Sequence, residues 1–100
     1  MKPAVFHSEA EEEARQAAGY YEDQRENLGR EFRIEVEAAV RRLREAPEAY
    51  PEYDRRGTRK LVLRRFPFNL FFVELEDGLW IAAVAHHKRR PGYWWGRRPE

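Results

Sequence analysis

The chain has 100 residues, 42% of them hydrophobic, and a formal net charge of +1 at pH 7, a length and composition that predict one domain with a single core. It contains no cysteine, which excludes disulfides and thiolate metal sites. The glutamates from Glu9 onward argue against a secretory signal, and no apolar run is long enough to span a membrane, so we expect a cytoplasmic protein with one domain over residues 1–100.

The first residues predict a short strand followed by a helix. Pro3 to Phe6 is a brief apolar run, and Pro3 fits only its beginning, at or near a sheet edge. Ser8 fits a helix N-cap, and Glu11 would complete an S-x-x-E capping box. Residues at helical spacing then lie on one face of this helix, namely Ala10, Ala14, Ala17 and Tyr21. Because this face is mostly alanine, we expect the helix to pack closely against its neighbour.

A second helix is expected from about Arg30 to Ala46, after an interruption at residues 24–29. Pro47 ends it, because proline cannot continue a helix and restricts the residue before it. Two helices joined by so short a link predict an antiparallel helical hairpin. The buried stripe expected on the second helix consists of Phe32, Val36, Ala39, Val40 and Leu43.

Three strands are expected after a loop at residues 47–58. Leu61 and Leu63 alternate with Lys60, Val62 and Arg64, which predicts a strand with one buried face. The centre of residues 66–76 is apolar on both faces, as in an interior strand. Asp77-Gly78 predicts a tight primed turn with positive φ angles, leading into a last strand at residues 79–86.

The element order β-α-α-β-β-β predicts an α+β fold, with a mainly antiparallel sheet and the helical hairpin packed on one face. The two halves of the chain carry opposite net charge. Residues 1–50 carry 8 Lys and Arg against 12 Asp and Glu, a net charge of −4, while residues 51–100 carry 11 against 6, a net charge of +5. This division indicates an acidic partner, either nucleic acid or protein, although two ordinary solvated surfaces would give the same counts.

His86 and His87 are the first candidates for chemistry. As neighbours on a strand they point to opposite faces, so only one can be buried. One can act as a general acid or base near neutral pH. We favour a backbone-bonded histidine beside a solvated one, because no partner carboxylate or nucleophile is evident. Neither a metal site nor a cofactor is expected, since adjacent histidines seldom converge on one ion and His7 is distant in sequence.

Basic residues are concentrated in the second half of the chain. If they converge on one sheet surface, with aromatic residues beside them, they suit single-stranded nucleic acid or a protein partner. Solvated arginines and a tail packed onto the domain explain the same residues, and both interpretations stay open. The aromatic residues are Tyr93, Trp94 and Trp95, and the basic ones are Arg55, Arg56, Arg59, Lys60, Arg64, Arg65, Lys88, Arg89, Arg90, Arg97 and Arg98.

Several short motifs follow one another along nearly the whole chain. They are Ala14, Ala17 and Tyr20-Tyr21-Glu22, then Leu28-Gly29 and Phe32, Pro47-Glu48-Ala49-Tyr50-Pro51, Arg59, Leu63 to Phe68, Ala83 to His86, and Arg89 to Trp94. Each is weak alone, but their order and spacing are specific. Together they resemble the RelE/ParE superfamily of toxins from prokaryotic type II toxin-antitoxin modules, whose fold is the α+β fold expected above.

The resemblance implies one of two activities. RelE-like members are ribosome-dependent endoribonucleases that cut mRNA without a metal, whereas ParE-like members poison DNA gyrase. The Pro-Glu-Ala-Tyr-Pro loop, the Arg-Phe-Pro-Phe strand and the histidine before the basic tail are more similar to ParE, which implies a gyrase inhibitor that acts by binding. The residues expected to bind the target are then Arg59, Arg64, Arg65, Lys88, Arg89, Arg90, Tyr93 and Trp94.

Two alternatives remain. A RelE-like catalytic site would use Arg64, Arg65, His86, His87, Arg89 and Tyr93. The second alternative is a non-toxin module that binds RNA or protein. For either toxin, the resemblance implies a cognate antitoxin with an acidic binding segment, a toxin-antitoxin hetero-oligomer, and a role in growth inhibition and plasmid stabilisation.

Overall fold

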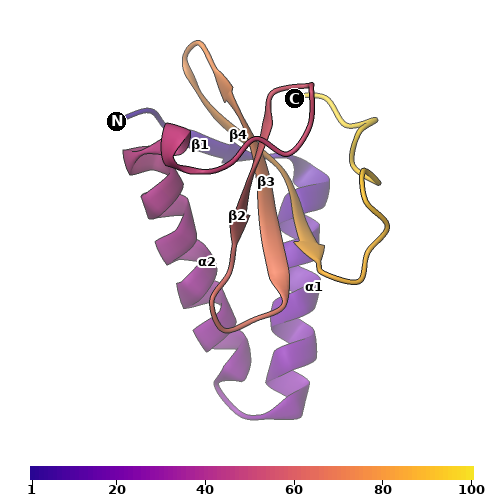
Figure 1. The fold of residues 1–100 in the computed structure, drawn as a ribbon. Helices are drawn as coiled ribbons and strands as arrows, with labels where there is room; N and C mark the ends of the chain where they lie inside the picture. The colour runs from indigo at the N-terminus through magenta and orange to yellow at the C-terminus, as the bar shows by residue number, and fades with distance from the viewer.

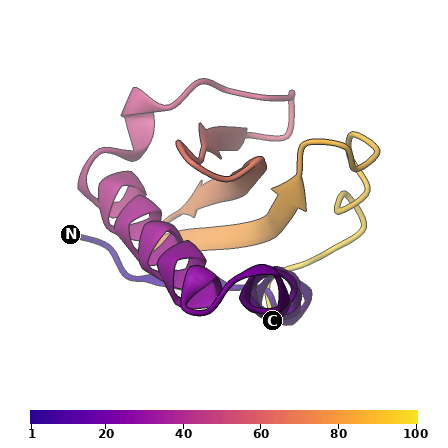
Figure 2. The same ribbon diagram turned by 90° about the horizontal axis from the view of Figure 1, so that it is seen from below.

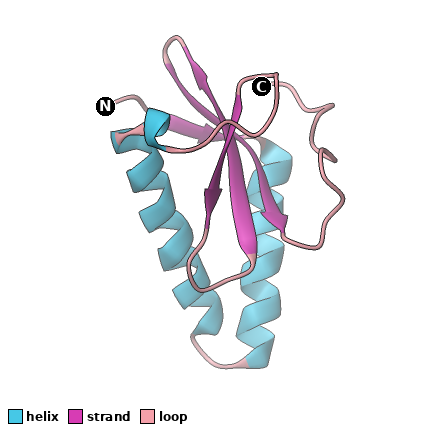
Figure 3. Ribbon diagram, viewed as in Figure 1, coloured by secondary structure: helices cyan, strands magenta, loops and turns pink.

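The computed structural model describes all residues, 1–100, and has two helices and one four-stranded sheet (Figures 1 and 3). The elements in chain order are β1 (Ala4–Phe6), α1 (Ser8–Gln24), α2 (Leu28–Glu45), a short 3₁₀ helix η1 (Pro47–Ala49), β2 (Thr58–Val62), β3 (Phe68–Leu75) and β4 (Gly78–His86). The sheet order is β1-β4-β3-β2, with β1 parallel to β4 and the other pairs antiparallel. The predicted α+β fold is confirmed, with one parallel pair at the edge. Neither helix has an apolar stretch long enough to cross a membrane.

The two helices cover one face of the sheet (Figure 2). The alanine face of α1 lies against the core: Ala10 is fully buried, and Ala17 is nearly so. The predicted stripe of α2 is also confirmed, because its apolar residues are buried or partly buried against the same core. The largest fully buried side chains of this core are Phe32, Leu43, Leu61, Leu70, Phe72, Leu79, Ile81 and Val84.

The predicted start of the first helix is wrong by one residue. His7, and not Ser8, is the N-cap, and its Nδ1 accepts a hydrogen bond of 3.0 Å from the Glu9 amide. The His7 amide donates to the Ile81 carbonyl, so sheet pairing continues to the residue directly before the helix. Ser8 is therefore the first helical residue, and its side chain makes no capping box with Glu11.

The second helix begins at Leu28, two residues earlier than predicted, because the first helix caps it. The Glu22 carboxylate accepts hydrogen bonds from the amides of Asn27 and Gly29, and Asn27 makes the turn with a φ of 70°. Gly29 is consequently inside the helix. A Cβ at Gly29 would lie 2.3 Å from the Ala18 carbonyl oxygen, so this glycine allows the two helices to approach closely.

The β3–β4 hairpin is present, but its turn is not the predicted primed turn. Leu75 pairs with Gly78, so Glu76 and Asp77 form the turn, and neither Asp77 nor Gly78 has a positive φ. Gly78 instead faces β1: a Cβ there would lie 3.0 Å from the Pro3 carbonyl oxygen, which accepts the Leu79 amide. Contact with the edge strand, and not turn geometry, accounts for this glycine.

The second face of the sheet, opposite the helices, is covered by the chain after β4. A smaller cluster of Phe71, Ala82, Ala83, Ala85 and Trp94 is buried there. The ring of Trp94 is stacked on Phe71, with 3.9 Å between ring centroids. Residues 91–100, called the tail below, therefore complete the fold, and the apolar character of β3 and β4 on both faces has a structural reason.

The two helical glycines give a matched test of the helix contact. Gly29→Ala should lower the free energy of unfolding by about 2 kcal/mol, since its Cβ collides with backbone. Gly19→Ala should raise that free energy by about 0.5–1 kcal/mol, because Gly19 lies inside α1 with nothing within 4 Å of its Cβ position. Urea denaturation followed by circular dichroism measures both, and equal effects would refute the close helix contact.

Candidate functional site

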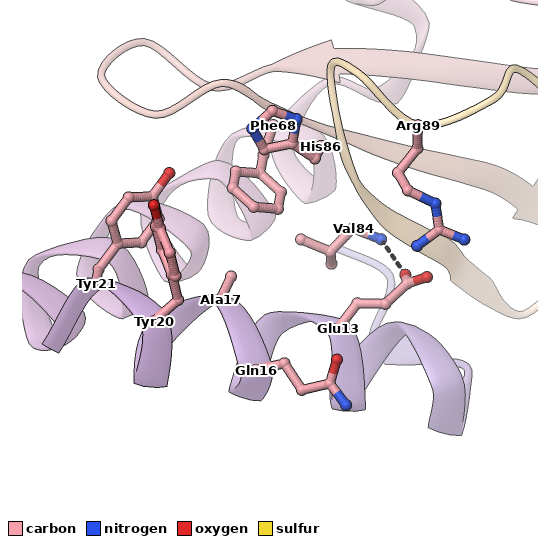
Figure 4. A pocket seen from close by; sticks show the side chains of 9 residues that line it. All are labelled: Glu13, Gln16, Ala17, Tyr20, Tyr21, Phe68, Val84, His86 and Arg89. Atoms are coloured by element: carbon pink, nitrogen blue, oxygen red, sulfur yellow. Dashed lines mark hydrogen bonds between the residues drawn. The ribbon is translucent and has the colours of Figure 1, made fainter. Parts of the chain in front are cut away.

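A pocket of about 340 Å³ lies between α1 and the end of β4 (Figure 4). The sheet contributes Phe68, Val84 and His86, and Arg89 follows from the segment after β4. The lining residues from α1 are Glu13, Gln16, Ala17, Tyr20 and Tyr21. The strand-end histidine and one predicted arginine therefore share a single concave surface.

The two histidines lie in different environments, as their alternation on a strand predicts. His86 packs against Phe68, and its Nδ1 accepts a hydrogen bond of 3.0 Å from the Lys88 amide. This bond places the ring proton on Nε2, which has no hydrogen-bond partner in the protein. His87 is exposed, outside the pocket, with its Nε2 3.1 Å from Asn69 Oδ1. Only His86 is available to a ligand in the pocket.

Arg64 and Arg65 lie in the turn between β2 and β3, at the same end of the sheet as His86. The His87 amide donates to the Pro67 carbonyl, which joins this turn to the chain leaving β4. The Glu35 carboxylate accepts the amides of Arg64 and Arg65 at 2.6 and 3.1 Å and so fixes the turn on α2. The β2–β3 turn and the segment that follows β4 therefore lie side by side at one end of the sheet.

The two arginine side chains of this turn differ. Arg65 donates to Glu31 at 2.9 Å, and this hydrogen bond, followed by those from Arg25, holds the pKa of Glu31 below its usual range. Arg64 is exposed and makes no side-chain hydrogen bond or ion pair. Arg64 is therefore free to contact another molecule, whereas Arg65 is already paired.

Lys88, Arg89 and Arg90 are exposed in the turn after β4, and no carboxylate pairs with them. The Arg89 guanidinium lies over the Tyr93 ring, 3.8 Å from its centroid. These three cations and Arg64 form what we call the basic end of the sheet.

Two predicted target-binding residues lie elsewhere. Arg59, in β2, donates to the Tyr50 carbonyl at 2.6 Å and lies 3.9 Å from the Glu52 carboxylate, so it holds the loop after η1. Trp94 is 3% exposed and stacks on Phe71, so it is a core residue with almost no surface to offer a partner. Packing of the tail, the second interpretation of the aromatic residues, accounts for Trp94.

Glu13 is the residue that sequence reasoning missed. Its carboxylate accepts four hydrogen bonds: the Val84 amide at 3.0 Å, the Tyr93 hydroxyl at 2.8 Å, and two from the Arg97 guanidinium at 3.2 and 2.9 Å. Arg97 also donates to the Ala82 carbonyl at 2.8 Å. A signal was present in the sequence, because Glu13 shares the helix face of Ala10 and Ala17, where a carboxylate is unexpected.

The side chains of Glu13 and Arg97 bond to the backbone of β4 where no neighbouring strand does. β1 pairs only with Leu79 to Ile81, so the next part of β4 has no strand beside it on that edge. Glu13 and Arg97 bind the outward amide of Val84 and the outward carbonyl of Ala82, respectively. The open edge of β4 is thereby satisfied by side chains from α1 and the tail.

Tyr93 is constrained by the same contacts. Burial, and then its hydrogen bond to the negatively charged Glu13, raise the pKa of Tyr93 well above its usual value. The phenol therefore stays protonated at neutral pH. No group of three His, Cys, Asp or Glu side chains comes together in a way that could hold a metal ion.

Comparison with known families identifies the chain. The sequence model of the family described as "ParE toxin of type II toxin-antitoxin system, parDE" matches residues 4–91. The chain belongs to the ParE toxin family. The resemblance inferred from its sequence motifs is confirmed, on the ParE side of the superfamily, and the chain is accordingly a toxin of the type II toxin-antitoxin class.

Solved structures agree on the fold of this ParE-family toxin. A chain described as "Chromosomal ParDE TA system from P. aeruginosa" superposes with a TM-score of 0.74 at 17% sequence identity. The match covers 86% of this chain and 96% of that chain. No curated protein matches the sequence significantly. The family match ends at residue 91, so most of the tail, including Tyr93, Trp94 and Arg97, lies outside it.

Removal of the Glu13 carboxylate tests its role in this ParE-family toxin. Glu13→Ala leaves the Arg97 guanidinium, which is 11% exposed, with only the more distant Glu9 carboxylate at 3.8 Å, and should lower the free energy of unfolding by about 2–3 kcal/mol. Glu12→Ala is the matched control, because Glu12 pairs only with Arg15 and Gln16 at the surface and should cost less than about 1 kcal/mol. Chemical denaturation measures both, and similar losses would contradict a special role for Glu13.

Proposed function

We propose that this toxin stops bacterial growth by binding DNA gyrase, without chemistry of its own, and that a cognate antitoxin neutralises it. Family membership supports the toxin role. The observation that carries the mode of action is the basic end of the sheet, where Arg64, Lys88, Arg89 and Arg90 are exposed without carboxylate partners. Arginine is favoured in protein hot spots, and unpaired cations steer association with an acidic surface.

Cleavage of mRNA on the ribosome is the second candidate, because His86 and Arg89 line one pocket. Arg64 is also free at this end of the sheet, but the polar groups of three other predicted catalytic residues are engaged elsewhere. Arg65 is paired with Glu31, His87 lies outside the pocket beside Asn69, and Tyr93 donates its proton to Glu13. Because the Tyr93 hydroxyl already donates to Glu13, it is not free to take part in proton transfer to RNA, and we favour binding over catalysis.

The antitoxin is expected to approach the same basic end. Opposite charges across an interface increase the association rate and the specificity. An antitoxin segment rich in Asp and Glu would complement Arg64 and the exposed cations of residues 88–90. We therefore propose a cytoplasmic toxin-antitoxin hetero-oligomer in which the antitoxin and gyrase compete for this surface.

The test is expression of the toxin in bacteria without an antitoxin, with DNA and mRNA followed separately. The wild type should arrest growth, induce the DNA-damage response and leave mRNA intact. The triple variant K88A/R89A/R90A should require at least tenfold more toxin for the same arrest, since three contacts of about 0.5–1 kcal/mol each would be lost.

The control variant is R30A/R33A/R41A, which removes the same charge from exposed positions of α2. It should arrest growth as the wild type does, and circular dichroism should show both triple variants folded. Cleavage of mRNA at defined codon positions, abolished by His86→Ala, would overturn the gyrase proposal in favour of the nuclease. Equal loss of toxicity in both triple variants would show that toxicity depends on the net charge of the protein and not on the cations of the basic end.

A further inference from the structure

The free cations of the basic end continue onto the tail. Arg98 is exposed, and its guanidinium donates only to the backbone carbonyls of Trp95 and Arg97. It shares a broad hollow of about 660 Å³ with Arg89 and Arg90. Together with Arg98, the cations of the basic end form a set without carboxylate partners that we call the basic stripe: Arg64, Lys88, Arg89, Arg90 and Arg98.

Carboxylates beside the basic stripe are already bonded within the protein. Glu35 accepts two backbone amides of the β2–β3 turn. In the hollow, Glu9 lies 3.8 Å from the Arg97 guanidinium, and Glu100 accepts hydrogen bonds from the amide and the hydroxyl of Ser8. Because none of these carboxylates pairs with the stripe, its five cations are available to an anion outside the chain.

The surface around the basic stripe offers little apolar area. Three of the seven large apolar residues that are exposed lie near it, namely Val62, Tyr20 and Trp95, and they belong to β2, α1 and the tail. A protein hot spot has apolar or aromatic anchors at its centre, where charged residues are depleted. Phosphate groups of nucleic acids are contacted instead by exposed Arg and Lys side chains. The stripe therefore has the composition of a phosphate-binding surface.

The aromatic residues beside these cations are poorly placed to stack on bases. Trp94 is buried. The Arg89 guanidinium covers the Tyr93 ring, and the Arg56 guanidinium lies 4.6 Å from the centroid of the Trp95 ring. Proteins that hold single strands use several free rings for successive bases. The stripe thus suits the backbone of a duplex better than a single strand.

The location of the stripe in the fold also bears on sequence recognition. All five cations lie in turns or in the tail, outside the helices and strands. Base edges in the major groove are read by a helix or a two-stranded ribbon that enters the groove. Contacts from turns reach the sugar-phosphate backbone, which carries no sequence information directly.

We propose that the basic stripe binds the phosphate groups of duplex DNA, independently of base sequence. Each guanidinium or ammonium group contacts a phosphate and releases a counterion condensed on the duplex. The inference deepens the proposed function and rests on it for the source of the duplex, which is the DNA on which gyrase acts. The toxin then contacts gyrase and the DNA bound to it at the same time.

The salt dependence of DNA binding tests the proposal without gyrase. Fluorescence anisotropy of a labelled duplex of about 20 base pairs is followed as purified toxin is added, at about 50 to 200 mM KCl. Each phosphate contact contributes about 0.9 to the slope of log K against log salt, so five contacts predict a slope of about −4.5. Duplexes of unrelated sequence should bind equally, and the single strand several-fold more weakly. Unlabelled duplex should compete better than polyglutamate at equal total charge, because the charges of polyglutamate are more widely spaced.

Variants assign the contacts to the stripe. K88A/R89A/R90A should reduce the slope to about −1.8, whereas R30A/R33A/R41A, with the same net charge, should leave it unchanged. Arg98→Gln should reduce the magnitude of the slope by about 0.9. Arg55→Gln is the matched single control, because Arg55 is exposed but lies outside the stripe, and it should have no effect.

The proposal is overturned if both triple variants change the slope equally, if the single strand binds more tightly than the duplex, or if polyglutamate competes as well as DNA. The last result would assign the stripe to an acidic protein surface. Because gyrase is absent from the assay, a negative result leaves the gyrase proposal standing. Undiminished supercoiling together with intact DNA binding would overturn only the gyrase proposal.

Discussion

The hydrogen bonds of the Glu13 carboxylate connect the three parts on which this structure depends. One side chain on α1 binds the backbone of β4 at Val84 and two side chains of the tail, Tyr93 and Arg97. The carboxylate is needed because β1 is too short to pair with the rest of β4. An open edge in the most buried strand would otherwise expose unpaired backbone groups. The same contacts hold the tail over the second face of the sheet, where Trp94 packs.

The surfaces that can act on other molecules follow from this arrangement. Because the tail is fixed by Glu13, the segment between β4 and the tail must turn outward, and it presents Lys88, Arg89 and Arg90 to solvent. The β2–β3 turn is held beside it by the bond from His87 to Pro67 and adds Arg64. The closed edge of β4 and the exposed basic end thus both depend on the contacts of Glu13 with the tail.

Sequence periodicity was sufficient for the fold and insufficient for the contacts between distant segments. The helical stripes, the strand order along the chain and the interior position of β3 follow from spacings of 3.6 and 2 residues. The cap at His7, the early start of α2 and the role of Gly78 depend on partners far along the chain, namely Ile81, Glu22 and Pro3. For the site, the exposed cations and the opposite orientation of His86 and His87 were predictable. The burial of Trp94 and the pairing of Arg65 with Glu31 were not, because both depend on tertiary contacts.

We propose that the basic end of the sheet acts by binding gyrase and that the His86 pocket cleaves no RNA. The most direct measurement is the supercoiling activity of purified gyrase in the presence of the purified toxin and no other component. If the toxin binds gyrase, supercoiling should fall as toxin is added and recover when an acidic antitoxin is supplied. Undiminished supercoiling, together with cleavage of mRNA when the same toxin is added to purified translating ribosomes, would contradict it.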